Sequence, residues 1–166
     1  MKKSALYAVA IGVVLTGTVP AFAGIADTPL PVLQAGATTY HLYSVPGVIG
    51  NAGGLRTFFS CASTDTAPMQ VGVGLFPPFG GLPENDAVAT SLTVGPGATV
   101  IFGTGAAVGI SVSASLGGGS SKGSARILAT SKKLACTAFI ADAGNAPPTS
   151  AWQLTIIAKT KQKAAN

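Results

Sequence analysis

Charged side chains are scarce in this chain of 166 residues. They make up 9% of it, against about 25% in typical soluble domains. The formal net charge is +5, and Lys2 and Lys3 at the N-terminus contribute to it. Such a weak positive balance argues against a nucleic-acid-binding protein, which needs dense basic patches. Uncharged polar residues must cover much of the surface, as in extracellular proteins, polymeric assemblies and some ordinary monomers.

Metal-ligating residues are also few, with one histidine and two cysteines in the whole chain. A metal ligand or a general base at His41 would need partners, so we interpret His41 as a surface or hydrogen-bonded residue. Oxygen ligands for calcium occur at Glu84, Asn85 and Asp86, but their spacing matches no established calcium loop, and a solvated turn is the simpler interpretation. We therefore expect no metal and no cofactor.

Long apolar runs are absent beyond the N-terminus. There, two lysines precede an apolar run from Ala5 to Val19, and Ala21-Phe22-Ala23 follows. This order is typical of a secretory signal peptide, here residues 1–23, cleaved after Ala23. The run is shorter than the about 20 residues of a membrane span, although an uncleaved anchor stays an alternative. We expect an exported protein, periplasmic or extracellular, with no membrane span after cleavage.

Export would place the two cysteines in an oxidising compartment. In an oxidising compartment an isolated pair is most simply a disulfide, so we predict a bond between Cys61 and Cys136. The chain-entropy model assigns about 4 kcal/mol to a bridge that closes so long a loop. Free thiols or a metal pair are the alternative.

Alternating apolar residues predict strands. Met69, Val71, Val73 and Leu75 alternate with glutamine and glycine, and the polar turn 63–68 separates them from an apolar run that carries Cys61. We predict a hairpin of strands 55–62 and 69–76. The clearest alternation in the chain, at 108–116, predicts another strand.

The remaining segments extend this pattern to about nine short strands. After an extended arm at 24–39, which contains Pro29 and Pro31, we predict strands at 40–45, 88–94, 99–103, 124–130, 134–141 and 152–159, then a basic tail at 160–166. The fold class is therefore all-β: an antiparallel sandwich of about 7–9 short strands over residues 40–159. In it, a disulfide between an early and a late strand would join the two sheets.

Residues 92–102 read Leu-Thr-Val-Gly-Pro-Gly-Ala-Thr-Val-Ile-Phe, a strand, a Pro-Gly turn and a strand. With the spacing of Cys61 and Cys136, this unit resembles the immunoglobulin-like modules of bacterial secreted proteins. The sequence departs from antibody domains because the single tryptophan, Trp152, follows the second cysteine. The resemblance implies an immunoglobulin-like sandwich and no activity.

Catalytic motifs are weak. Residues 119–123 fit the Gly-x-Ser-x-Gly form of a hydrolase nucleophile, but a predicted strand follows in place of a helix, and no histidine comes later in the chain. A flexible loop explains the segment better. We expect no enzyme and no catalytic residue.

Three groups of residues remain as candidates for binding. Phe76, Pro77, Pro78, Phe79 and Leu82 form an unusually apolar loop that could meet a partner, either another copy of the chain or another envelope protein. Tyr40, Tyr43 and Trp152 could stack on sugars. Lys159, Lys161 and Lys163 recur at every second residue and could contact an anionic polymer. We expect a structural, adhesive or assembly role at the bacterial cell envelope, with carbohydrate or ligand binding as the alternative.

Overall fold

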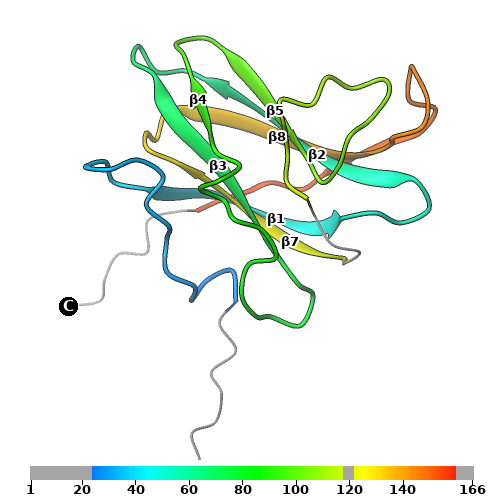
Figure 1. The fold of residues 1–166 in the computed structure, drawn as a ribbon, viewed down its shortest axis with the longest axis horizontal. Coiled ribbons are helices and arrows are strands. Elements are labelled where there is room, and N and C mark those ends of the chain that lie inside the picture. The colour runs from blue at the N-terminus through cyan, green and yellow to red at the C-terminus, as the bar shows by residue number, and fades with distance from the viewer. Residues whose placement is uncertain (1–23, 118–121, 160–166) are drawn as a thin grey trace, which may run out of the picture.

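The computed structural model describes residues 24–117 and 122–159, in which two β-sheets pack face to face (Figure 1). Sheet A has the strand order β10-β1-β7-β3-β4, and its strands are β1 (Tyr40–Ile49), β3 (Met69–Phe76), β4 (Leu92–Val94), β7 (Lys122–Ala129) and β10 (Ile157–Ala158). Sheet B has the order β6-β5-β2-β8-β9, and its strands are β2 (Leu55–Ser63), β5 (Thr99–Gly103), β6 (Ala114–Ser115), β8 (Leu134–Asp142) and β9 (Ala151–Leu154).

All neighbouring strands are antiparallel except β5 and β6. The all-β prediction is therefore confirmed, with ten strands in the described residues where we expected seven to nine. These residues form no helix, and so none that is long and apolar enough to cross a bilayer. The predicted signal peptide and basic tail lie outside the described residues.

The core lies between the two sheets. Alternate residues of the central strands point into it, including Val71 and Val73 from β3, Ile127 from β7, and Phe59 from β2, all fully buried. The residues between them point to the outer face of each sheet. On sheet A this places Arg126 and Leu128 of β7 on the outer face, where the N-terminal segment covers them.

The predicted hairpin of residues 55–62 and 69–76 is wrong. Both segments are strands, but β2 pairs with β5 and β8 in sheet B, whereas β3 pairs with β4 and β7 in sheet A. The turn between them crosses from one sheet to the other, and its Thr64 amide donates to the Lys133 carbonyl oxygen. The Pro-Gly turn at 95–97 also joins the two sheets, because β4 and β5 belong to different ones.

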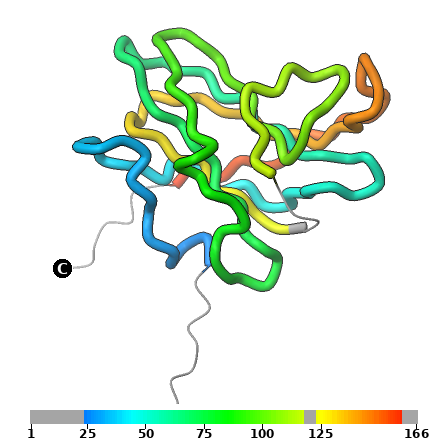
Figure 2. The backbone as a smooth tube through the Cα atoms, in the orientation of Figure 1, coloured from blue at the N-terminus to red at the C-terminus, as the bar shows by residue number. Residues whose placement is uncertain are grey.

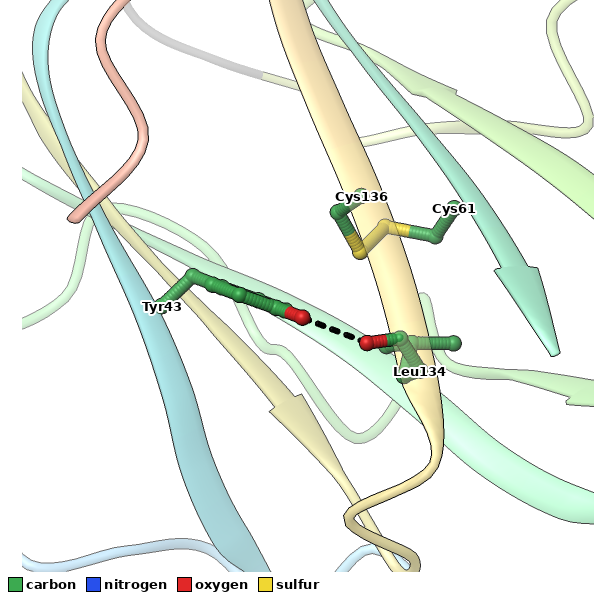
Figure 3. Close-up of a disulfide and its surroundings, with 4 residues drawn as sticks. All are labelled: Tyr43, Cys61, Leu134 and Cys136. Carbon is green, nitrogen blue, oxygen red and sulfur yellow. Dashed lines mark hydrogen bonds between the residues drawn. A yellow bond between two sulfur atoms is a disulfide. The ribbon is translucent and has the colours of Figure 1, made fainter. Parts of the chain in front are cut away.

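The disulfide exists, but the prediction that it joins the two sheets is wrong. Cys61 on β2 and Cys136 on β8 face each other as register partners within sheet B, with their Cα atoms 4.1 Å apart (Figure 3). That distance is close to the about 4.5 Å of a non-hydrogen-bonded antiparallel pair. A hydrogen bond links the sheets nearby: the Tyr43 hydroxyl of β1 donates to the Leu134 carbonyl oxygen of β8 at 2.5 Å.

Four predicted strands have clearly different bounds, and one of them, predicted at 88–94, is a strand only at Leu92–Val94. The first continues through Pro46 and Gly47 to Ile49, with a register shift between Pro46 and Val48. The last divides into β9 and β10, which belong to different sheets. The predicted strand at 108–116 is a strand only at Ala114–Ser115.

The failure at 108–116 has a local cause. The Ser113 hydroxyl accepts from the Ile101 amide, and the Ser113 amide donates to the Ile101 carbonyl oxygen. A serine side chain thus takes the place of a backbone partner beside β5, which interrupts the ladder. Upstream, Gly109 packs against the backbone of residues 145 and 146 instead of a strand.

The segment 24–39 forms no strand and crosses the outer face of sheet A, where it passes close to the loop that follows β3 (Figure 2). We call this segment the N-terminal arm. Leu33 of the arm packs with Leu128 and Ala87 in a small apolar cluster. Gly72 makes room for it, because a Cβ atom at that position would lie 3.0 Å from Leu33 Cδ2 and 2.7 Å from the Ala87 carbonyl oxygen.

Candidate functional site

Arg126 holds the N-terminal arm against sheet A. Its side chain is 2% exposed, and its Nη1 and Nη2 donate to the carbonyl oxygens of Thr28 at 2.8 Å and Pro29 at 3.1 Å. The guanidinium carbon lies 4.9 Å from the centroid of the Phe76 ring, a cation–π contact. Burial lowers the pKa of Arg126 from its usual value, but an arginine stays protonated in a protein. Sheet A therefore carries a buried cation whose partners are two backbone oxygens and a ring.

A cleft of about 720 Å³ opens between the arm and strands β1 and β10, and we call it the arm cleft. Its volume lies within the range of about 300–1,000 Å³ that is usual for small-molecule sites. The arm supplies one wall, and β1 and β10 supply the other. The apolar part of the lining consists of Ile25, Ala26, Pro29, Leu30, Leu42 and Ala158.

Three cationic side chains reach the arm cleft: Arg126 of β7, Lys132 of the turn after β7, and Lys159 just beyond β10. The Lys132 ammonium lies 4.6 Å from the centroid of the Tyr40 ring. One carboxylate, that of Asp27, also lines the cleft. The cleft thus has an excess of positive charge at neutral pH.

His41 lies between these lysines as a neutral side chain. Its Nε2 is 3.1 Å from the Tyr43 carbonyl oxygen and 3.0 Å from the Ser44 hydroxyl. Since a carbonyl oxygen only accepts, we assign the ring proton to Nε2, which leaves Nδ1 to accept from the Lys159 ammonium at 3.5 Å. Burial, and then the positive charge of Lys159, lower the pKa of His41 from 6.5 to about 4. The imidazole therefore adds hydrogen-bonding groups to the cleft and no charge at pH 7.

Several residues that the sequence singled out meet in this cleft. Tyr40, Tyr43 and Lys159 line it, whereas Trp152, the third candidate aromatic, lies on β9 of sheet B and is 54% exposed. The Tyr43 ring packs against the core and its hydroxyl is bonded to the Leu134 carbonyl oxygen, whereas the Tyr40 ring contacts the Lys132 ammonium. Lys161 and Lys163 lie outside the described residues.

Arg126 and Lys132 were missed by the sequence reasoning. Arg126 does carry a signal, because it is the one charged residue in the apolar run Ala125–Ala129. A charge in the middle of a strand that is apolar on both faces must be paired or bonded once it is buried. Lys132 carries no comparable signal, since lysines are common in turns.

The apolar loop after β3 presents a second surface. Phe79 is 94% exposed and Leu82 is 74% exposed, and Pro78 between the strand and the tip is exposed as well. Pro77 is half-buried, and Phe76 is 2% exposed because it lies beneath Arg126. The tip of the loop thus offers two large apolar side chains to solvent, while its first residue belongs to the interior.

The weak motifs for metals and catalysis gain little support. Within residues 24–117 and 122–159, no cluster of three or more histidine, cysteine or acidic side chains is arranged to hold a metal. Asn85 and Asp86 bond to the backbone of their own loop or of β3, and Asp142 accepts from Asn145, Thr149 and Ser150. Residues 119–121 of the Gly-x-Ser-x-Gly segment lie outside the described part.

Comparison of the chain with protein families, with curated proteins and with solved structures finds no match. The geometry of the arm cleft and of the apolar loop therefore carries the functional argument.

Proposed function

We propose that this chain is an exported, non-catalytic β-sandwich protein that binds a ligand in the arm cleft and serves an adhesive or structural role at the bacterial cell envelope. The observation that carries this proposal is the convergence of side chains from distant segments on one cleft. Tyr40 and His41 come from β1, Arg126 and Lys132 from β7 and its turn, and Lys159 from the end of the domain. Ligand sites combine apolar walls with a few polar groups in this way.

Export is part of the proposal. The predicted signal peptide at 1–23 and the Cys61–Cys136 disulfide both fit an oxidising compartment. Cell fractionation followed by N-terminal sequencing tests it. We expect a chain that begins at Gly24 in the periplasm or the medium, and a chain retained in the cytoplasm with Met1 would contradict the proposal.

The immunoglobulin-like architecture also stays a proposal. Two packed five-stranded sheets support it. The placement of both cysteines in sheet B departs from antibody domains, in which the disulfide joins the two sheets.

The single histidine provides a direct test of ligand binding. Because His41 lies in the arm cleft and the chain has no other histidine, its two carbon-bound ring protons give NMR signals that report on this site alone. We would screen the secreted protein against neutral oligosaccharides, acidic oligosaccharides and amphiphiles. A saturable shift of the His41 signal with at least one class is expected. A signal that no class moves would contradict ligand binding in this cleft.

Assembly through the apolar loop is a second candidate, favoured by the exposure of Phe79 and Leu82. Light scattering of the secreted protein should then show concentration-dependent association. The double variant Phe79→Ser, Leu82→Ser should remove this association, while Val108→Ser, which changes an exposed apolar residue on another loop, should leave it. A strict monomer at high concentration would rule this candidate out.

A further inference from the structure

We infer that the arm cleft takes an amphiphilic anion, a molecule with an apolar body and one carboxylate or phosphate head. This inference rests on the proposed function and names the class of ligand that the cleft recognises. It follows from the distribution of apolar and charged groups around the cleft.

The apolar body has a wall on each side. Ile25, Pro29 and Leu30 of the arm line one side of the cleft, and Leu42 of β1 and Ala158 of β10 line the other. Arg126 and Leu33 fix the arm in this position, since the guanidinium binds two arm carbonyl oxygens and Leu33 packs into the space beside Gly72. Apolar surface on both sides can remove an alkyl or ring system from water, which stabilises the complex.

Two lysines at the cleft, Lys132 and Lys159, are available to bind the acidic head. Lys132 contacts the Tyr40 ring and Lys159 contacts the neutral His41, and neither ammonium has a carboxylate at salt-bridge distance within the described part of the chain. The neighbouring Lys133 differs, because its ammonium lies 3.3 Å from Asp65. Two cations without an acidic partner beside one cleft favour an anionic group there. The Nε2 proton of His41 is held by Tyr43, so the lysines are the groups that would meet the head.

A neutral sugar fits this cleft less well. Stacking on a sugar needs an open aromatic face. The Lys132 ammonium covers the Tyr40 ring, and the Tyr43 ring packs against the core with its hydroxyl bonded to the Leu134 carbonyl oxygen. The two tyrosines of the cleft that the sequence suggested for sugar stacking are therefore engaged in other contacts, and the third candidate, Trp152, lies outside the cleft.

The test is a titration of the secreted protein with defined probes below their micelle concentration, read from the His41 ring signals. Decanoate and decyl phosphate carry the apolar body with each head, decanol carries the body alone, and acetate and inorganic phosphate carry each head alone. We expect at least one of the two amphiphilic acids to bind at least about tenfold more tightly than decanol and than its own head group. The bound anion should also raise the pKa of His41 from about 4, because it offsets the positive charge of Lys159.

The two heads distinguish the source of the ligand. Preference for decanoate indicates a fatty acid or a related carboxylate, and preference for decyl phosphate indicates a phospholipid or another phosphate ester. Either preference supports the shared chemistry.

Three lysine variants make the test specific. Lys132→Gln and Lys159→Gln should each weaken binding of the preferred acid about threefold to fivefold, as expected for partly exposed charge pairs. Lys133→Gln removes the same charge from the next position, where the ammonium faces Asp65, and should change the affinity less than twofold.

Each contrary outcome has a distinct meaning. If a neutral oligosaccharide shifts His41 and the acids do not, the inference is wrong and the proposed function stands. If no probe and no oligosaccharide shifts it, both are wrong. Equal affinity for decanol and the acids, or an equal loss in Lys133→Gln, would overturn the inference, because binding would then depend on apolar contact alone or on overall charge.

Discussion

Replacement of Arg126 by methionine should release the N-terminal arm while the sandwich stays folded. Methionine matches the aliphatic part of the arginine side chain and carries no charge, so it loses the guanidinium contact with the Phe76 ring and both hydrogen bonds to Thr28 and Pro29. Hydrogen bonds from a charged group contribute about 1.5–3 kcal/mol each. The cost of burying the guanidinium, whose Nε has no partner, offsets part of this contribution.

We therefore expect the free energy of arm opening to fall by about 2–3 kcal/mol. That corresponds to an approximately 30- to 150-fold faster exchange of the arm amides with solvent. Hydrogen exchange can follow two of them: the Leu33 amide, which donates to Thr39 Oγ1, and the Thr28 amide, which donates to the Gly24 carbonyl oxygen. Amides in the centre of β7 should keep their protection.

Arg56→Met is the matched control, because Arg56 is a second arginine with a buried Nε that lacks a partner, and it packs against Gly105. It lies on β2 in sheet B and should leave arm exchange unchanged. The reasoning would be refuted if the arm amides of Arg126→Met exchanged at the rate of the unsubstituted protein. It would also be refuted if the arm and β7 lost protection together.

Three further predictions concern stability. Tyr43→Phe removes the hydrogen bond to the Leu134 carbonyl oxygen and should lower the free energy of unfolding in urea by about 1 kcal/mol; no change would mean that this bond between the sheets adds nothing. The double variant Cys61→Ala, Cys136→Ala should lose about 4 kcal/mol, with reduction of the unsubstituted protein as the parallel measurement, and equal stability of oxidised and reduced protein would contradict a structural role for the bond. The low pKa of His41 means that the unfolded chain binds a proton between about pH 6.5 and 4 that the folded chain does not, so stability should decrease as pH falls through this window. His41→Gln should flatten that part of the pH profile, and an unchanged slope would show that other groups cause it.

The sequence predicted the strands better than their partners. Alternation at Met69–Leu75 depends only on which face is buried, so β3 appears where expected. Pairing depends on contacts between distant segments, and both β2 and β3 find better partners than each other. The disulfide was misplaced because strand pairing is not specified locally. The sequence indicates that Cys61 and Cys136 can form a bond, but it does not indicate whether the bond lies within one sheet or between two.

The candidate site was predictable only in pieces. Tyr40 and Lys159 were named as separate candidates, but their meeting depends on the pairing of β10 with β1, which no local pattern specifies. Arg126 was overlooked because the strand at 124–130 was predicted from its apolar residues, and the single charge within it was not considered. The arm at 24–39 was read as extended from its prolines, but its attachment to sheet A follows from Gly72 and Arg126, which are distant in sequence.

The most direct test of the central claim is to map the binding of decanoate and of decyl phosphate by NMR on the isotopically labelled protein. The account predicts shifts confined to the cleft, at Ile25–Leu30 of the arm, Tyr40–Tyr43 of β1, the turn at Lys132, and Ala158 and Lys159, with contacts from the alkyl chain to Leu42. Shifts that gather instead on the apolar loop at Phe79, or around Trp152 on sheet B, would contradict it.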